Sequence, residues 1–392
     1  MTGGVSGGVT GAAMTVGMPG ADREDLLARV ALGRLAEPGD PGVGALVREH
    51  GSVAALDRVL RRRGQLRARD RVRDAAEADL ARVSVLGARV VVPGSTEWPT
   101  QLDDLGAATP LLLYQLGAAS LRLSALGSVA VVGARAATPY GVRVAQDLGS
   151  GLASRGVAVV SGGAFGVDAA AHRGALAVDG PTVCVLACGI DVAYPRAHEA
   201  LLARIADDGA LVSEVPPGVG PLRHRFLSRN RIIAALARGT VVVEAALRSG
   251  ARNTAGTARD LGRVVMGVPG PVTSAMSAGV HELIREGAVL VGDSDDVLTS
   301  MGPLTWGGPV RRGATHPRDG LARRECRVLD AFPARAPVGV EPLATDSGCP
   351  VGEVVASLGL LEALGLVVRA DDGWTLTPLA RTSTSASEAP AP

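Results

Sequence analysis

A regular alternation of short valine-rich runs and helical stretches, from about Ser128 to Gly292, constrains the fold of this chain more than any other feature. The apolar runs read SVAVV, VAVV, TVCVLAC, ALVSEV, TVVVEAA, RVVMGV and AVLVG. Strands that are buried on both faces are continuously apolar, and strands that alternate with helices form parallel sheets. The pattern therefore predicts an α/β fold, with a Rossmann-like, doubly wound and mainly parallel sheet as the core (128–292) of a domain that covers residues 85–300.

Composition agrees with such a core. Apolar residues make up 47% of the chain but aromatic residues only 2%, so Val, Leu, Ala and Ile must fill the interior, which suits parallel strands better than a β-sandwich. No apolar run is long enough to span a membrane, so we expect a cytoplasmic protein with no membrane partner. Four cysteines, two of them in the apolar CVLACG run, do not make a disulfide framework, and we expect neither a metal ion nor a cofactor.

The rest of the chain divides into shorter parts. The pattern between residues 21 and 84 predicts a small helical, SAM-like domain, in which Ser52 is the expected N-cap of the second helix. Its arginines fit either DNA contact or a solvated helix face. A linker is expected at 301–320, and the ends, 1–20 and 381–392, are expected to be disordered.

Residues 321–380 predict a winged-helix domain. A first helix and a Pro-broken connector precede a helix–turn–helix at Glu341 to Leu364, and a short hairpin with Asp372-Gly373 at its turn follows. The expected recognition helix is apolar and carries glutamates rather than arginines, which disfavours contact with a DNA major groove. Protein contact or regulation is the alternative role.

The first loop of the sheet domain, GARAATPYG, has the features of a phosphate-binding turn. In parallel α/β sheets, ligands bind beyond the carboxyl ends of the strands, where helix N-termini offer unpaired N–H groups. Gly133 permits a tight turn, Arg135 projects from the loop, and Tyr140 follows at the start of the next helix. A dinucleotide fingerprint would need glycines at Arg135 and Thr138, so an NAD site is not supported.

The second loop, SGGAFGVDAAAH, offers a similar cradle. Ser161, Gly162 and Gly166 allow close approach to the backbone. Asp168 and His172 lie four residues apart on one helical face. These two side chains are as consistent with a structural role at the helix start as with a role at the site.

The most informative stretch is PLRHRFLSRNRIIAALARG, because no acidic residue occurs between Val215 and Val243 to balance its charge. Within nine residues it carries Arg223, His224, Arg225, Arg229 and Arg231, with Phe226 and Asn230 between them. All 40 cationic side chains of the protein are Arg, yet the net charge is only +1, so the positions of the arginines matter more than their number. An aromatic ring among arginines favours a single-stranded nucleic acid, because bases stack on the ring while cations hold phosphates.

Further candidates follow the later strands. The fifth apolar run continues into EAALRSGARNTA, in which Ser249, Gly250 and Thr254 form another helix start suited to phosphate oxygens. Glu214 and Glu244 end the fourth and fifth runs. We expect these two glutamates to organise the arginines.

In this order, the motifs resemble those of the DprA/Smf family of DNA-processing proteins. The matching segments, within roughly Leu26 to Pro378, are VGARAATPYG, SGGAFGVDAAAH, CGIDVAYP, SEVPPG, FLSRNRII, VVEAALRSGARNTA and VPGPV. The resemblance implies a protein that is not an enzyme, that binds and protects single-stranded DNA, and that loads the RecA recombinase during DNA uptake, natural transformation and recombination. It also implies a homodimer.

The resemblance also assigns roles to individual residues. It implies that Arg135 and the Arg229-Asn230-Arg231 segment line the DNA pocket, with phosphate contacts from Ser161, Gly162, Ser249 and Gly250. We expect three arginines to grip phosphates while a ring offers a stacking face: Arg135, Arg229 and Arg231, with Phe226 or Tyr140. The sequence departs from the family pattern in places, since Leu227 stands where Pro is usual, SGARNT replaces Ser-Gly-Ser-Leu-Ile-Thr, and His281 replaces a common Asn.

Two other functions fit parts of the sequence. An enzyme similar to nucleoside-monophosphate phosphoribohydrolases would use Asp168, Glu214 or Glu244 as an acid or base, although the Pro-Gly-Gly-x-Gly-Thr loop of those enzymes does not occur in the sequence. A duplex DNA-binding protein would act through the winged helix. That function would leave the arginine-rich loops of the sheet domain unexplained.

Overall fold

The computed structural model describes residues 20–302, 321–333, 336–370 and 372–381. The chain divides into two compact units, Met1–Thr305 and Trp306–Pro392, and the described part of each has its own hydrophobic core. The predicted disordered ends and the predicted linker lie outside the described residues, apart from the residues at their borders.

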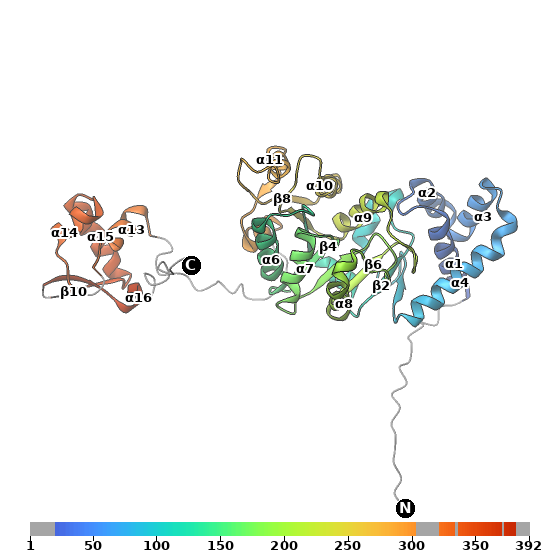
Figure 1. Ribbon diagram of the computed structural model, residues 1–392, viewed down its shortest axis with the longest axis horizontal. Coiled ribbons are helices and arrows are strands. Elements are labelled where there is room, and N and C mark those ends of the chain that lie inside the picture. Colours follow the sequence, from blue (N-terminus) through green and yellow to red (C-terminus); the bar gives the residue numbers. More distant parts are fainter. Residues whose placement is uncertain (1–19, 303–320, 334–335, 371, 382–392) are drawn as a thin grey trace, which may run out of the picture. The chain divides into compact units, whose positions relative to one another are not determined.

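Helices open the first unit (Figure 1). They are α1 (Gly20–Leu35), α2 (Pro41–His50), α3 (Ser52–Arg62), the short 3-10 helix η1 (Leu66–Ala68) and α4 (Arg69–Val85). Leu27, Val30 and Leu60 pack between these helices, and the same apolar cluster includes Tyr114 of the sheet and Ile190. Because they share a core, the helices and the sheet form one compact unit. A separate SAM-like domain stays a prediction.

The predicted N-cap role of Ser52 is wrong. Helix α3 begins at Ser52 itself, and the residue before it, Gly51, has a φ of 78° and no side chain to cap with. The buried Ser52 hydroxyl instead donates to the carboxylate and to the main-chain oxygen of Asp25 in α1. Ser52 therefore joins two helices that are distant in sequence, which a local capping pattern does not reveal.

All seven predicted strands are present and lie parallel in one sheet. They are β3 (Ser128–Val132), β4 (Ala158–Ser161), β5 (Thr182–Val185), β6 (Ala210–Ser213), β7 (Gly239–Val242), β8 (Val264–Gly267) and β9 (Val289–Leu290). Their order, β6-β5-β4-β3-β7-β8-β9, confirms the predicted α/β fold with a mainly parallel sheet. The strand order reverses between β3 and β7, which is where ligands bind in doubly wound sheets.

Two further strands extend this sheet at one edge. Strands β1 (Arg89–Val91) and β2 (Leu113–Leu116) pair antiparallel with each other, and β2 pairs antiparallel with β6. The 3-10 helix η2 (Thr100–Ala108) connects them, and α5 (Leu121–Leu126) leads into β3. The sheet is therefore mixed at this edge and parallel elsewhere.

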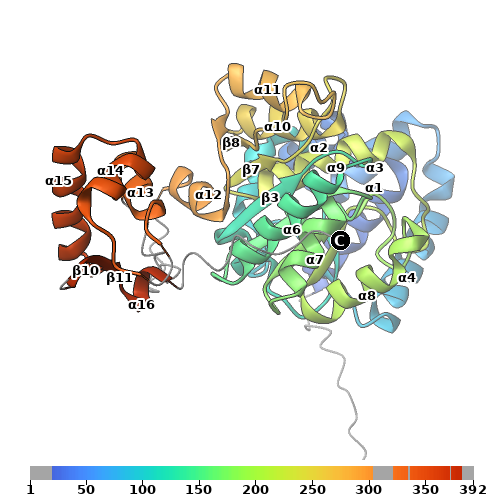
Figure 2. The ribbon, with the colours of Figure 1, turned by 60° about the vertical axis from the view of Figure 1, so that its left-hand side comes forward.

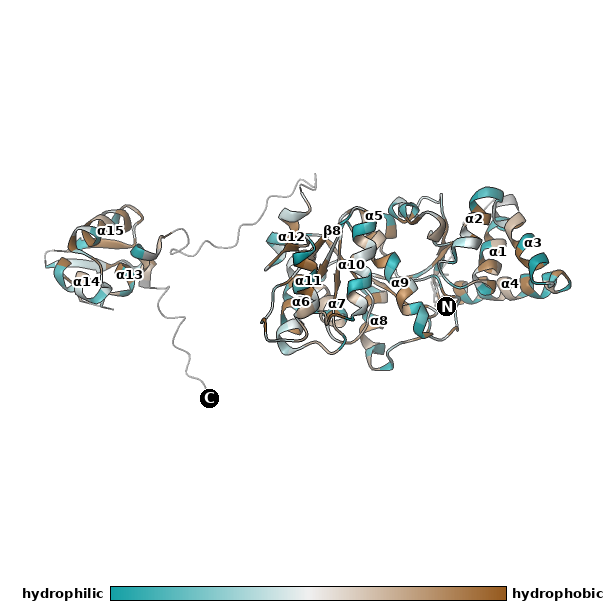
Figure 3. Cartoon of the chain, turned by 90° about the horizontal axis from the view of Figure 1, so that it is seen from above, coloured by the Kyte–Doolittle hydropathy of each residue, from teal (hydrophilic) through white to brown (hydrophobic). Residues whose placement is uncertain are grey.

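Helices cover both faces of the sheet. They are α6 (Pro139–Ala153), α7 (Val167–Leu176), α8 (Glu199–Asp208, after the 3-10 helix η3, Arg196–His198), α9 (Arg223–Leu236), α10 (Gly250–Asp260), α11 (Ala278–Arg285) and α12 (Ser294–Ser300). Val129 and Val131 of β3 pack with α6, α7 and α12, whereas Ala130 and Val132 pack with α9, α10 and α11. Because alternate side chains of a strand point to opposite faces, each strand is apolar throughout. The helices show both teal and brown residues in Figure 3, as expected of elements with one face on a core.

The second unit contains the elements expected at the C-terminal end (Figure 2). They are α13 (Arg323–Asp330), α14 (Val340–Ser347), α15 (Val351–Ala363), the hairpin of β10 (Val367–Ala370) and β11 (Gly373–Leu376), and α16 (Pro378–Arg381). Gly348, in the left-handed conformation, ends α14 ahead of α15. This order agrees with a helix–turn–helix followed by a hairpin, and the winged-helix assignment stays a prediction. Of the helices in the described ranges, none has the length and apolar character needed to cross a membrane.

Candidate nucleic-acid interface

A pocket of about 500 Å³ opens at the carboxyl ends of the central strands. Its lining comes from the end of β3 and the loop after it, the loop that enters α7 with the first turn of that helix, Tyr194 in the segment after β5, α9, and the first turns of α10. The pocket lies beside β3 and β7, where the strand order reverses. It therefore forms at the sheet edge where the sequence predicted the binding loops to meet.

The pocket brings together half of the predicted site residues. These are Gly133, Arg135, Asp168, Phe226, Arg229, Asn230, Ser249, Gly250 and Thr254. Tyr194 and Arg223 also line it, although the prediction did not select them as site residues. Both could have been selected from the sequence, since Tyr194 follows the third apolar run and Arg223 begins the arginine-rich stretch. Leu227, where the family pattern has Pro, is part of the lining as well.

Cations and aromatic rings stand together in this pocket. The Arg135 guanidinium lies 4.9 Å from the centroid of the Phe226 ring, a cation–π contact, and the ring centroids of Phe226 and Tyr194 are 5.5 Å apart. Arg135 and Arg223 are exposed, and neither forms an ion pair or a hydrogen bond with any residue that the structure describes. Free cations beside aromatic rings suit a ligand that carries both phosphates and planar bases.

Arg229 also lines the pocket, but its charge is directed into the protein. The residue is 6% exposed, and its Nη1 donates to the main-chain oxygen of Gly162 at 2.8 Å and to that of Val185. Burial lowers the pKa of Arg229, while the carboxylate of Asp168 opposes this effect. The guanidinium thus holds the ends of β4 and β5, and the geometry does not support the predicted phosphate grip.

Asp168 lies at the start of α7 and lines the same pocket. Its Oδ2 accepts hydrogen bonds from the main-chain N–H groups of Gly162, at 3.2 Å, and Ala164, at 3.4 Å. Burial raises the pKa of Asp168, while Arg229 and these N–H groups act in the opposite direction. Asp168 therefore makes structural contacts at the start of α7 and also lines the pocket, so both roles that the sequence left open stay predictions.

Glycines allow the loops around Arg229 to approach closely. A Cβ at Gly162 would lie 2.2 Å from Nη1 of Arg229, and a Cβ at Gly166, whose φ is 76°, would lie 2.2 Å from the main-chain oxygen of Ala134. Neither Gly162 nor Gly166 belongs to the lining. Both predicted contacts with phosphate are therefore replaced by a role in packing.

Ser161 and His172 are fully buried and do not line the pocket. The Ser161 hydroxyl donates to the main-chain oxygen of Val131 at 2.7 Å, so its hydrogen is used within the sheet and the predicted phosphate contact is wrong. The Nδ1 atom of His172 lies 2.8 Å from the hydroxyl oxygen of Thr182, which itself donates to Val159. Burial lowers the pKa of His172 to about 3, so the ring is neutral and its role is structural.

Glu244 and Tyr140 stabilise the loop between β3 and α6. The Glu244 carboxylate accepts from the N–H of Thr138 at 2.9 Å and from its hydroxyl at 2.6 Å, and the Tyr140 hydroxyl donates to the oxygen of Pro269 at 2.5 Å. A carboxylate at a helix N-terminus interacts favourably with the helix dipole. The expectation that Glu244 organises an arginine is therefore wrong, and the stacking face in the pocket comes from Phe226 rather than Tyr140.

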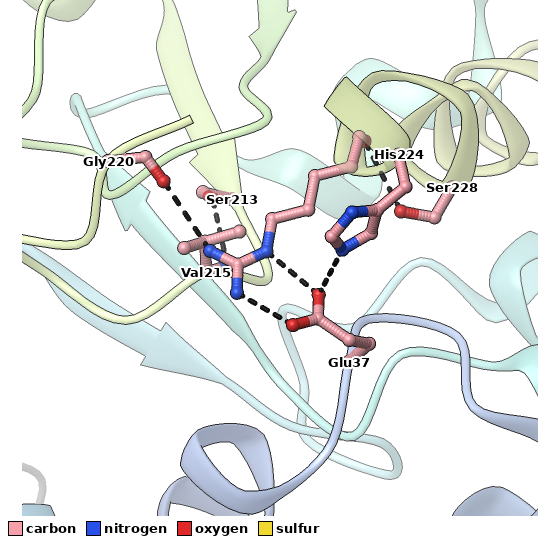
Figure 4. A network of polar contacts seen from close by, with 7 residues as sticks. Glu37, Ser213, Val215, Gly220, His224 and Ser228 are labelled. Carbon is pink, nitrogen blue, oxygen red and sulfur yellow. Dashed lines mark hydrogen bonds and ion pairs between the residues drawn. The ribbon is translucent and has the colours of Figure 1, made fainter. Parts of the chain in front are cut away.

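The other cations of the arginine-rich stretch are paired with acids from elsewhere in the chain. Arg231, 9% exposed, binds Glu214 through hydrogen bonds of 2.7 and 2.8 Å, as expected of that glutamate. Figure 4 shows Glu37, which follows α1, in contact with His224; Arg225 binds the same carboxylate at 2.9 Å through both Nε and Nη2. The bond from Arg225 lowers the pKa of Glu37 to about 2. Arg225 and Arg231 do not line the pocket, which corrects their predicted DNA contact.

The fold and the pocket together define a parallel α/β protein with a cationic, ring-lined site suited to a nucleic acid. In the part of the chain that the structure describes, no group of three or more His, Cys, Asp or Glu side chains is placed to hold a metal ion. The lining offers arginine, aromatic and main-chain groups to a ligand.

Comparison with known proteins agrees with this class. The family model of DNA recombination-mediator protein A matches residues 89–302. A Mycobacterium tuberculosis protein that bears the DprA name is 48% identical over 365 residues, which cover 88% of this chain and 92% of that protein. Smf of Escherichia coli is 40% identical over 254 residues, which cover 63% of this chain and 67% of Smf. The X-ray structure of DprA from Streptococcus pneumoniae matches with a TM-score of 0.58 and 32% identity, covering 70% of this chain and 97% of that one. The chain belongs to the DprA/Smf family of DNA-processing proteins, which confirms the resemblance.

Proposed function

We propose that this protein binds single-stranded DNA in the pocket beside β3 and β7. The observation that carries the proposal is the group of Arg135, Phe226 and Tyr194, together with the free Arg223. The arginines supply phosphate contacts, and the rings supply a stacking face worth about 1–3 kcal/mol per base. Duplex DNA keeps its bases stacked inside, so rings that line an open pocket favour the single strand. Membership of a DNA-processing family supports DNA as the polymer.

We also infer a binding role rather than a catalytic one. The enzyme alternative needs an acid or base among the carboxylates of the sheet edge. Glu214 is paired with Arg231, and Glu244 caps α6 through Thr138, so neither carboxylate is available to a substrate. Asp168 is the one acidic residue of the pocket lining, and no second carboxylate of the described residues lies there to act with it. Incubation with purine nucleoside monophosphates should therefore release no free base.

The wider role rests on the family resemblance. We infer a cytoplasmic homodimer that protects incoming single strands and loads the RecA recombinase onto them during DNA uptake and recombination. In this proposal the SAM-like helices precede the DNA-binding sheet in the sequence and the winged helix follows it. Addition of RecA to preformed complexes on single strands tests the loading step, because loading predicts faster RecA filament formation with the protein than without it.

The pocket is tested by salt-titrated binding to oligo-dT with the full chain. Each phosphate contact on a single strand contributes about 0.7 to the slope of log affinity against log salt, so Arg135→Ala with Arg223→Ala should reduce the slope by roughly 1.4 and weaken binding. Arg225→Ala is the matched control for Arg223→Ala, since it removes the same charge two residues further along α9 from a site paired with Glu37. An unchanged slope in the double variant, or an equal loss in the control, contradicts the pocket assignment.

A further inference from the structure

One group in the pocket does not fit a surface made for phosphates. Asp168 places a carboxylate in the lining, together with Arg135 and Phe226, although it is only 7% exposed. A carboxylate repels a phosphate, whereas it attracts a group that donates hydrogen bonds. A ligand group with N–H donors therefore suits this part of the lining better than a phosphate does.

The two oxygens of Asp168 differ in their surroundings. Oδ2 accepts from the main-chain N–H groups of Gly162 and Ala164. Oδ1 has no hydrogen-bond partner among residues 20–302 or in the other described ranges. The N–H bonds to Oδ2 fix the carboxylate in one orientation, so Oδ1 is a preset acceptor within the pocket.

Phosphates and sugars of DNA carry no N–H donor, so the bases are the part of the strand that can donate an N–H to Oδ1. The rings of Phe226 and Tyr194, whose centroids are 5.5 Å apart, are part of the same lining. A base that enters the pocket and stacks on a ring presents its hydrogen-bonding edge to the remaining walls, as in sites that read unpaired bases. The arginines of the lining and the carboxylate of Asp168 therefore suit different parts of a strand, the arginines its phosphates and the carboxylate the edge of a base.

The bases differ in what they offer to an acceptor. The Watson–Crick edge of guanine presents adjacent N–H donors, N1–H and the exocyclic N2 amino group. Thymine presents one N–H between carbonyl oxygens, while adenine and cytosine each present an amino group beside a ring nitrogen acceptor. Oxygen or nitrogen lone pairs placed next to a carboxylate are unfavourable, so guanine is the best match.

We propose that Asp168 makes this pocket a guanine-preferring base site within the single-stranded DNA interface, with its Oδ1 accepting hydrogen bonds from the base edge. The inference rests on the proposed DNA-binding function and adds a base preference to it. Asp168 is then a specificity-determining residue, while Arg135 and Arg223 hold the neighbouring phosphates of any strand.

The test measures binding of the full chain to oligo-dT and to the same strand with one central thymidine replaced by deoxyguanosine, deoxyadenosine, deoxycytidine or deoxyinosine. The single guanine should tighten binding by roughly tenfold, the scale of a two-bond base contact. Inosine, which lacks the N2 amino group, should show a smaller gain than guanine. Equal affinity for all these strands overturns the base proposal, whereas absence of oligo-dT binding overturns the proposed function itself.

The Asp168→Asn variant tests the residue. Its amide oxygen can still accept from Gly162 and Ala164, while its amide nitrogen presents donors where Oδ1 was. The guanine preference should disappear, and a strand with deoxyxanthosine, which carries an oxygen in place of the N2 amino group, should gain. Asp179→Asn, at an exposed residue just after α7, is the matched control and should leave the ranking of bases unchanged.

These measurements separate specificity from folding. The salt slope on oligo-dT and the thermal unfolding midpoint of Asp168→Asn show whether the pocket is intact. A guanine preference that persists in a folded Asp168→Asn protein overturns the role of Asp168. If the variant fails to fold, the ranking of guanine, inosine and thymine by the unmodified protein still decides the proposal.

Discussion

The cations near the N-terminal half of α9 form two sets, one without an acidic partner and one bound to acids. Arg223 and, from the neighbouring loop, Arg135 are exposed and unpaired within the described residues. Arg225 and Arg231, on the same helix, are bound to Glu37 and Glu214. In the sequence all of these arginines look alike, since they lie close to aromatic or apolar residues and away from acids.

The difference shows that arginines close together in the sequence need not form a cationic surface, because acids from distant segments can pair with them. Glu37 lies after α1 and Glu214 after β6, and each reaches α9 only because the helices at the start of the chain and the sheet share one compact unit. The paired arginines attach α9 to its neighbours. The unpaired ones remain for a ligand.

The largest expected effect concerns the buried pair. Arg231→Ala leaves the carboxylate of Glu214, whose side chain is 8% exposed, without its partner. Loss of one partner of a buried ion pair costs about 3–5 kcal/mol, so the urea midpoint should fall strongly. The double change Glu214→Leu with Arg231→Met should recover most of this loss, because it leaves no uncompensated charge. A small effect of Arg231→Ala would show that the pair does not attach α9.

A second, smaller effect concerns the ring beneath Arg135. Phe226→Leu keeps an apolar side chain but removes the stacking face, which is worth about 1–3 kcal/mol and so weakens oligo-dT binding roughly 5- to 150-fold. The salt slope should stay the same, because no phosphate contact is lost. Phe165→Leu is the control, since that ring is exposed on the same sheet edge but packs on His198 outside the pocket. Equal losses in the two variants would contradict a stacking role for Phe226.

The smallest effect concerns Glu37. Its pKa falls from 4.5 to about 2 in the folded protein, so its contribution to stability is present above pH 4.5 and is lost as the pH falls through about 2. Because the side chain is 52% exposed, solvent screening keeps this contribution below about 1 kcal/mol. Glu37→Gln should remove this pH dependence of the free energy of unfolding, measured by urea titration at pH 6 and pH 3, and should leave DNA binding unchanged. A loss of DNA binding in this variant would contradict the division between paired and free cations.

The parallel sheet was predictable because each of its strands is buried on both faces. Val129 and Val131 face one helical layer and Ala130 and Val132 the other, so the whole run must be apolar, and this shows in the sequence without reference to distant residues. The positions of the loops were predictable as well, because the carboxyl ends of parallel strands lie at one edge of the sheet. Ser52 was not, because its partner, Asp25, lies on another helix.

The candidate site was predicted in position but not in detail. Arg135 and Phe226 are where the loop pattern placed them. The prediction missed that Arg229 turns inward to main-chain oxygens and that Ser161 uses its hydroxyl within the sheet, because both depend on which carbonyl groups the strand ends leave unpaired.

The sequence by itself determined the alternating strands and helices, the edge at which the binding loops meet, and the family, because these depend on local burial and on residue types in order. Only the tertiary structure decided which charges are free. Ion pairs and buried hydrogen bonds join residues far apart along the chain, and the distance between Arg225 and Glu37 is set by how the two packed elements meet. Arg135 and Arg223 remain exposed because no acid among the described residues forms an ion pair with either, although Asp168 lines the same pocket.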